Sequence, residues 1–294
     1  MIGAVLVVGD VMTDIIVVPE GPIVPGSDRR ASIRNRPGGS GANQAVWLAA
    51  AGAEVRFAAR VGAVDRAMYE GHFRRLGVVP ALAGDTDLPS GVLVTLIDPH
   101  GERSFLTDRG ANLNLCAADL GPRLLDGVGL VLVSGYSFFA PGPRAAVQDL
   151  LARARRAGIG IAIDPASTGF LAEVGIAAFR DWVGPADFLF ANADEAEMLV
   201  GTADPEEQMR DLGAQFAQVV VKRGAAGAAL GTRAGVVLSR PAETVRVRDS
   251  TGAGDAFAAG FVAALLRGES PAACLEQGIA NGARAVQVVG GQPQ

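Results

Sequence analysis

The chain has 294 residues, 49% of them hydrophobic, and can therefore bury the core of one large α/β domain. Its formal net charge of −5 gives no overall positive field for nucleic acid or an anionic membrane, so a small-molecule partner fits better. Charge or glycine interrupts the apolar stretches well before the roughly 20 residues of a membrane span, and we expect a cytoplasmic protein.

The order of short and long apolar segments predicts the fold class. Residues 1–8 are apolar, lack the basic start of a signal peptide and are followed at once by Asp10 and Asp14, so we expect a buried first strand. Further β-like runs at 131–134, 159–164, 187–190 and 219–222 alternate with alanine-rich helical stretches. This alternation predicts βαβ units and a three-layer α/β/α fold around a mostly parallel sheet. No linker stands out, so one domain is expected over 1–294.

Two regions break this alternation. Residues 15–37 are punctuated by proline and glycine, and residues 91–107 contain two runs that look like paired strands. We expect both regions to form antiparallel additions outside the main sheet.

The two cysteines, Cys116 and Cys274, lie far apart in the sequence. Their spacing matches neither a disulfide framework nor a set of metal ligands. We interpret both as reduced, buried thiols.

The strongest functional signal is the segment 249–255, which reads Asp-Ser-Thr-Gly-Ala-Gly-Asp. A strand-like run at 243–247 precedes it and an apolar helical run to Leu266 follows, so we expect a helix that begins near Gly252. The N–H groups at such a helix start bind phosphate or a developing anion, and glycines let the backbone come close. Asp255 then lies in the first turn, where it can accept the proton of a substrate hydroxyl during phosphoryl transfer.

Two other interpretations of this segment stay open from its residues alone. Asp255 would merely complement the helix dipole if the glycines form an ordinary turn. Gly252 and Gly254 also begin a dinucleotide-type Gly-x-Gly pattern, although no βαβ unit follows it. The sequence contains no Walker A segment, so an ATP site would be of another type.

A second glycine-rich segment, residues 37–45, reads Pro-Gly-Gly-Ser-Gly-Ala-Asn-Gln-Ala and leads into a helix. Together, the two segments resemble the PfkB or ribokinase family of carbohydrate kinases. The resemblance covers nearly the whole chain and extends to residues 9–14, 110–112, 192–195, 221–224 and the last helix. It implies an ATP-dependent kinase whose sugar site lies under a small β-lid, here roughly 15–37 and 91–107. Such proteins often form homodimers through their lids.

The resemblance implies roles for residues that bind the sugar and transfer the phosphoryl group. Positions that hold sugar hydroxyls are matched by Asp14, Gly39 and Asn43. The base is matched by Asp255, and the anion-binding amides beside it by Gly252, Ala253 and Gly254.

It also implies residues that bind the nucleotide and ions. The nucleotide phosphates are matched by Lys222 and Gly224, and the adenine side by Asn281. Asn192 and Glu195 match a motif that organises hydrated Mg²⁺, although residues three apart can equally form a helix capping box. Asp249 and Thr251 match the place of a monovalent cation, often K⁺, which would order the anion-binding turn.

Three departures leave the acceptor open. Met12, Ser40 and Tyr136 stand where ribokinases proper carry polar groups that bind ribose, so ribose itself does not follow. The arginines Arg29, Arg30, Arg34 and Arg36 of the lid are interpreted as a solvated face.

Arg109 lies near where kinases of 2-keto-3-deoxygluconate carry an arginine that could hold the substrate carboxylate. An exposed loop arginine paired with Asp108 or Asp98 is the alternative. The aromatic residues Tyr136, Phe138 and Phe139 would stack on a base in a nucleoside kinase, or belong to the core. A non-catalytic sugar or nucleotide sensor is the alternative from another class, and the intact Asp255, Asn192 and Glu195 argue against it.

Overall fold

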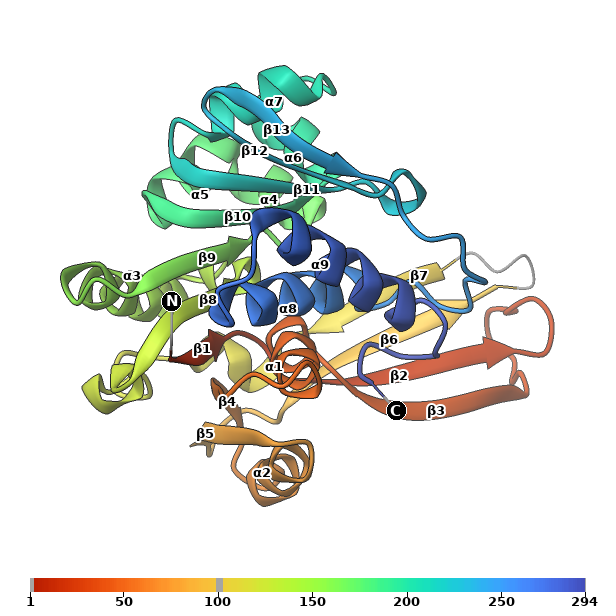
Figure 1. The fold of residues 1–294 in the computed structure, drawn as a ribbon. Coiled ribbons are helices and arrows are strands. Elements are labelled where there is room, and N and C mark those ends of the chain that lie inside the picture. The colour runs from red at the N-terminus through yellow and green to blue at the C-terminus, as the bar shows by residue number, and fades with distance from the viewer. Residues whose placement is uncertain (1–2, 99–102, 294) are drawn as a thin grey trace.

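A nine-stranded sheet forms the centre of the protein in a computed structural model, which describes residues 3–98 and 103–293 (Figure 1). Its strand order is β13-β12-β11-β10-β9-β8-β1-β4-β5. The strands are β1 (Ala4–Val8), β4 (Val55–Gly62), β5 (Val78–Asp85), β8 (Val128–Ser134), β9 (Gly160–Asp164), β10 (Ala186–Asn192), β11 (Phe216–Lys222), β12 (Ala228–Thr232) and β13 (Gly235–Arg240). Neighbours from β5 to β11 are parallel, and only β12 and β13 join antiparallel, which confirms the mostly parallel sheet.

Helices cover both faces of this sheet. They are α1 (Ser40–Ala50), α2 (Arg66–Arg75), α3 (Pro141–Arg156), α4 (Thr168–Val174), α5 (Ile176–Val183), α6 (Ala193–Val200), α7 (Pro205–Leu212), α8 (Ala253–Leu266) and α9 (Pro271–Ala285). Alternate side chains of β1 point to opposite faces: Val5 and Val7 join a core with α1, α2, α8 and α9, whereas Leu6 and Val8 join a core with α3 to α7. The three-layer α/β/α prediction is confirmed. Within the described ranges, no helix is both long and apolar enough to cross a membrane.

A second sheet of four strands projects from the main one as a lid (Figure 1). It has the order β3-β2-β6-β7, from β2 (Met12–Pro19), β3 (Ala31–Gly38), β6 (Gly91–Ile97) and β7 (Arg103–Asp108). The lid lies where the sequence placed it, but the expectation of purely antiparallel strands is wrong, because β2 and β6 pair in parallel. Both strands leave the parallel main sheet, from β1 and β5, in the same direction. Three of the four lid arginines are exposed and Arg36 is half-buried, in line with a largely solvated face.

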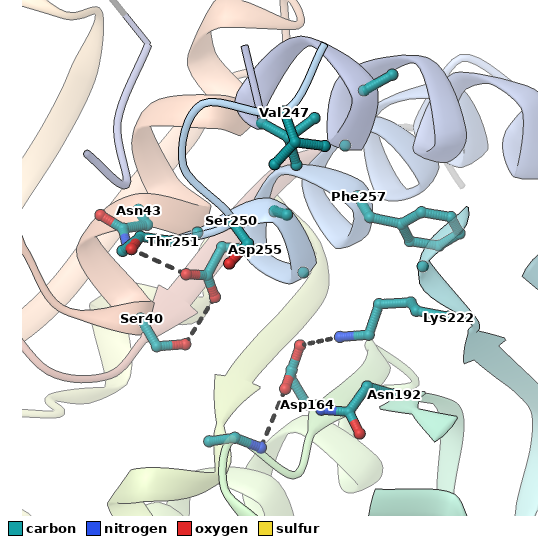
Figure 2. Close-up of a pocket in the computed structure, with 18 of the residues that line it drawn as sticks. Ser40, Asn43, Asp164, Asn192, Lys222, Val247, Ser250, Thr251, Asp255 and Phe257 are labelled. Carbon is teal, nitrogen blue, oxygen red and sulfur yellow. Dashed lines mark hydrogen bonds and ion pairs between the residues drawn. The ribbon is translucent and has the colours of Figure 1, made fainter. Parts of the chain in front are cut away.

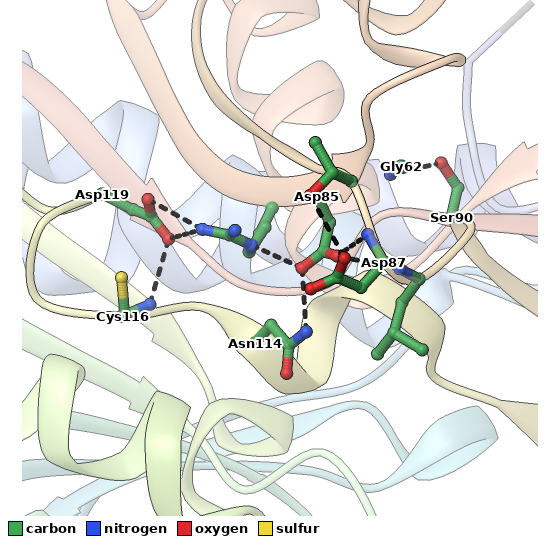
Figure 3. Close-up of polar contacts among 10 residues, drawn as sticks. Gly62, Asp85, Asp87, Ser90, Asn114, Cys116 and Asp119 are labelled. Carbon is green, nitrogen blue, oxygen red and sulfur yellow. Dashed lines mark hydrogen bonds and ion pairs between the residues drawn. The ribbon is translucent and has the colours of Figure 1, made fainter.

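Two local predictions are wrong. Residues 243–247 form no strand: the chain leaves β13 at the sheet edge and runs irregularly to α8, so its alternating valines have no strand to pair with, and Val247 is 63% exposed. Cys274 is buried as expected, but Cys116 is exposed, in a turn where its N–H donates to Asp119 at 3.0 Å (Figure 3).

A polar cluster joins the carboxyl ends of β4 and β5 to the loop that enters the lid (Figure 3). Arg60 Nε donates to Asp85 at 2.8 Å, and Asn114 Nδ2 donates to the same carboxylate at 2.9 Å. The backbone N–H groups of Asp87 and Leu88 donate to its other oxygen. Burial acts to raise the pKa of Asp85, but these hydrogen bonds outweigh it and hold the pKa well below its usual range. The cluster therefore fixes residues 85–88 as they approach β6.

Candidate active site

A cavity of about 810 Å³ opens at the carboxyl ends of the parallel strands, between the lid and helices α8 and α9. In open α/β sheets, this edge is where ligands bind. The strands β9, β10 and β11 deliver Asp164, Asn192 and Lys222 to it. The cavity brings together every residue predicted for the site except Asp249 and Asn281.

The start of α8 forms a positive corner of this cavity. Gly252 caps the helix in the left-handed conformation with φ of 73°, and Ala253 and Gly254 begin its first turn. Lys222 lies directly beside this turn, since a Cβ atom built on Gly254 would be 3.1 Å from Nζ. The helix N-terminus and the ammonium group together favour an anion at this point. The helix predicted to begin near Gly252 is confirmed.

Asp255 is held from α1 by three side-chain donors. Ser40 Oγ lies 2.8 Å from Oδ1 and Asn43 Nδ2 lies 3.1 Å from Oδ2 (Figure 2). Gln44 Nε2 lies 3.2 Å from Oδ1. Burial, and then the negative charge of Asp164, raise the pKa of Asp255 to about 7. A carboxylate with such a pKa can accept a proton near neutral pH.

Asp164 is a central residue of the site that sequence reasoning missed. Its Oδ2 accepts a hydrogen bond from Lys222 Nζ at 2.9 Å (Figure 2), and its Oδ1 accepts one from the N–H of Ala166 at 3.1 Å. Ala166 also lines the cavity and has φ of 75°, a strained value for a residue other than glycine. The available signal was an aspartate at the end of a predicted buried strand.

Asn192 and Glu195 form the capping box of α6 and also line the cavity. Asn192 Oδ1 accepts from the Glu195 N–H, and Glu195 Oε2 accepts from the Asn192 N–H, each at 2.8 Å. The two residues therefore form the helix cap and also face the cavity, where the magnesium motif was expected. Burial, followed by the charge of Asp164, raises the pKa of Glu195 to about 7. In the part of the chain that the structure describes, no group of three His, Cys, Asp or Glu side chains could hold a metal directly.

Two buried side-chain oxygens lie on the lid side of the cavity. Asp14 Oδ1 and Asn43 Oδ1 have no hydrogen-bond partner among the described residues. Buried polar atoms are normally satisfied, so such oxygens point to the hydroxyl or amino groups of a bound molecule. Burial and then the charge of Asp249 raise the pKa of Asp14 to about 6. Gly39 lies beside them as the N-cap of α1.

Arg109 is buried and lines the cavity, so the alternative of an exposed loop arginine is wrong. Its guanidinium pairs with Asp10 rather than with Asp108 or Asp98. Asp108 instead accepts a hydrogen bond from the N–H of Gly110 at 2.9 Å. The loop therefore folds inward and delivers the arginine to the cavity.

Two predicted residues lie behind the cavity wall. Asp249 accepts hydrogen bonds from the N–H groups of Thr251 and Gly290, each at 2.9 Å, and so joins the turn before α8 to the end of the chain. Thr251 itself lines the cavity. Asn281 packs against α8, where a Cβ atom on Gly260 would lie 2.9 Å from its Nδ2, so its neighbours Gly282 and Ala283 line the cavity instead.

Residues 3–294 match the family model described as pfkB family carbohydrate kinase. The chain belongs to this family. It is 32% identical over 305 residues to the bifunctional protein HldE of Shewanella sp. (strain ANA-3), covering 97% of this chain and 60% of that protein. It is 32% identical over 247 residues to the 1-phosphofructokinase of Rhodobacter capsulatus, covering 82% of this chain and 77% of that protein. The chain thus spans only about 60% of the length of the bifunctional relatives that it matches.

Solved structures share the fold of this chain. A probable sugar kinase from Rhizobium etli CFN 42 superposes with a TM-score of 0.88 at 24% identity, covering 99% of this chain and 95% of that one. A ribokinase from Thermotoga maritima superposes with a TM-score of 0.83 at 25% identity, covering 99% of this chain and 95% of that one. A putative ribokinase II from E. coli, in complex with ATP and Mg²⁺, superposes with a TM-score of 0.87 at 21% identity, covering 99% of this chain and 94% of that one. The ribokinase-like fold is therefore shown.

The three aromatic residues that follow β8 divide between core and cavity. Phe138 is fully buried and contacts Phe179 with ring centroids 5.9 Å apart, so it belongs to the core. Tyr136 lines the cavity. Phe139 stacks on Phe170 with centroids 5.2 Å apart, behind Tyr136. Of the three, only Tyr136 is placed to contact a ligand.

Proposed function

We propose that the protein transfers the terminal phosphoryl group of ATP to a hydroxyl group of a small sugar or sugar derivative, with Asp255 as the base. The observation that carries this proposal is the position of Asp255, in the first turn of α8 with its pKa raised to about 7. It lies between the acceptor-side residues Ser40 and Asn43 and the phosphate-side residues Asp164 and Lys222 (Figure 2).

The surrounding residues supply the remaining parts of the reaction. Asp14 and Asn43 accept hydrogen bonds from acceptor hydroxyls, and the lid limits access of water to the bound acceptor. Asp255 removes the proton of the reacting hydroxyl as the phosphoryl group arrives. The amides of residues 252–254, with Lys222, stabilise the transferred charge.

The nucleotide occupies the part of the cavity between the irregular segment 241–247 and α9, next to Gly224. Magnesium, when bound, neutralises phosphate charge. The oxygen atoms of Asn192, Glu195 and Asp164 suit a magnesium ion that keeps several waters. Asp249 and Thr251 would hold a potassium ion next to the turn before α8.

A nucleoside acceptor is the second candidate, favoured by the phenol ring of Tyr136 in the cavity wall. A homodimer formed through the lids is supported by exposed apolar side chains on that sheet, Ile33, Phe105 and Leu106. The names of relatives and solved neighbours, which include 1-phosphofructokinase, adenosine kinase and ribokinase, are compatible with several acceptors.

The test of this function is acceptor-dependent release of ADP. The protein would be incubated with ATP, Mg²⁺ and a panel of sugars, sugar acids and nucleosides. We expect ADP to appear only when a suitable acceptor is present. Ligand binding across the panel without any ADP release would contradict the proposal and favour a sensor.

Replacing Asp164 with Asn is expected to move the pH dependence of the reaction. Asp255 acts when deprotonated, so wild-type kcat/KM should rise with pH through about 7. The negative charge of Asp164 favours the protonated form of Asp255, and removing it should shift the rise about one pH unit lower. The measurement is kcat/KM against pH.

Asp187→Asn provides the matched control. Asp187 lies at the opposite, amino-terminal end of the neighbouring strand β10 and is exposed. Its variant should keep the wild-type pH profile. An unmoved profile in Asp164→Asn would show that Asp164 does not set the protonation of the base.

A further inference from the structure

The charged side chains that line the cavity are strongly unbalanced. Among its described lining residues, the acidic ones are Asp10, Asp14, Asp164, Glu195, Glu243 and Asp255, and the basic ones are Arg109 and Lys222. An anionic acceptor would therefore need one of two cations. Whether Arg109 or Lys222 can pair with such an acceptor depends on the partners that each already has.

Arg109 is paired with Asp10 through two of its three guanidinium nitrogens. Its Nε and Nη2 atoms each lie 2.9 Å from one of the two carboxylate oxygens of Asp10, the paired geometry that gives guanidinium and carboxylate groups their strongest contact. The side chains are only 7% and 8% exposed. A buried pair of this kind is held far more firmly than an exposed one, because separating it leaves two unsolvated charges.

Asn112 fixes both sides of this pair. Its Nδ2 donates to the carbonyl oxygens of Arg109 at 2.8 Å and Val11 at 2.9 Å, and its Oδ1 accepts from the N–H of Val11 at 2.9 Å. Val11 directly follows Asp10, so one buried amide ties the backbone of the acid to that of the arginine. Moving the guanidinium toward a ligand would break its two hydrogen bonds to Asp10, whose backbone is held in place beside that of Arg109.

Lys222 and the polar side chains in the first turn of α1 also have partners within the protein. Lys222 Nζ lies 2.9 Å from Asp164 and next to Gly254, on the side where phosphoryl transfer takes place. In the first turn of α1, Ser40 and Asn43 donate to Asp255. Both cations among the described lining residues are thus already paired with a carboxylate, and an acceptor anion would have to compete with that carboxylate.

We infer, building on the proposed kinase function, that the acceptor is an uncharged polyhydroxyl compound, and that Asp10 sets this specificity by occupying Arg109. A carboxylate or phosphate on the acceptor would enter a site whose two lining cations are already neutralised by carboxylates, and would lose its hydration without an unpaired counter-charge. Hydroxyl groups meet no such penalty, because Asp14 Oδ1 and Asn43 Oδ1 can accept their hydrogen bonds. Burial raises the pKa of both Asp14 and Asp255, which agrees with a site poor in positive charge.

Matched acceptors test this inference on the wild-type protein. D-Ribose would be compared with D-ribonate, D-glucose with D-gluconate, and D-fructose with its terminal phosphate ester. Binding is measured by calorimetry without ATP, and turnover by ADP release. The neutral member of a pair should be favoured by about tenfold or more, the scale of one charged hydrogen bond.

Asp10→Asn is the decisive variant, because it removes the acid and leaves Arg109 charged. It should raise the affinity for the anionic member, relative to the neutral one, by about tenfold. Asp85→Asn makes the same change in the Arg60 pair outside the cavity and should leave this ratio unchanged. Thermal unfolding shows whether each variant is folded. The comparison of matched acceptors on the wild-type protein does not depend on either variant.

The outcomes separate the inference from the function on which it rests. Equal or stronger binding of the anionic members by the wild type would overturn the inference, as would an unchanged ratio in folded Asp10→Asn. Preferred binding of neutral members without ADP release would overturn the proposed kinase function but support the charge argument. ADP release mainly in the presence of anionic acceptors would overturn the charge argument and support the proposed kinase function.

Discussion

Asp255→Asn is expected to lower kcat by about 10²- to 10⁴-fold, the usual contribution of a general base. The amide has nearly the same size as the carboxylate, and its oxygen can still accept the hydrogen bond from Ser40. It cannot accept the proton of the acceptor hydroxyl. Affinity for ATP should change little, because the amides of residues 252–254 and Lys222 stay in place. The measurements are single-turnover ADP release and calorimetric ATP binding.

Glu207→Gln tests the simpler view that Asp255 only complements a helix dipole. Glu207 lies in the first turn of α7, is exposed and is absent from the cavity wall. The substitution removes the same kind of favourable charge from a helix start, so a small loss of stability and full activity are expected. If Asp255→Asn behaved in the same way, Asp255 would not be the base.

The mostly parallel sheet and the glycine-rich helix starts could be predicted because both depend on local patterns. Continuous apolar runs mark buried parallel strands, and β1 (Ala4–Val8) lies within the apolar run at residues 1–8. Glycine-rich segments before helices mark the places where a backbone can approach a ligand, and both such segments line the cavity. The run at 243–247 shows the limit of this reasoning, because alternating apolar residues form a strand only where a neighbouring strand is available.

The pairing of charges could not be predicted, because it depends on contacts between distant segments. Asp10 and Arg109 are 99 residues apart, and Asp164 and Lys222 are 58 apart. The parallel sheet places the second pair on nearby strand ends, and the entry of the lid strands places the first. The family resemblance therefore indicated most of the residues that line the cavity, but not that each cation there already has a carboxylate partner. Asn281 was misplaced for a similar reason, since the contact between α8 and α9 decides which face of α9 it occupies.

Gly252→Ala is expected to lower kcat by roughly 10²- to 10³-fold, the effect of losing one donor to a developing anion. Two properties of Gly252 lead to this expectation. Its φ of 73° is unfavourable for alanine, and a Cβ atom would lie 2.6 Å from the carbonyl oxygen and 2.7 Å from the Cα of Gly291. Since these are backbone atoms, the turn before α8 must move, and its amides move with it. The measurements are kcat and thermal unfolding.

Gly201→Ala separates displacement of the turn from backbone strain. Gly201 ends α6 with φ of 86°, so alanine meets a comparable conformational penalty, but no atom lies within 4 Å of its added Cβ. Both variants should lose about 1 kcal/mol of stability from the strained backbone, with a further loss in Gly252→Ala from the contact with Gly291. Only Gly252→Ala should lose activity. Equal kcat values in the two variants would mean that the exact position of this turn does not matter, and that charge at the start of α8 is stabilised mainly by Lys222, whose ammonium would then be the group to substitute next.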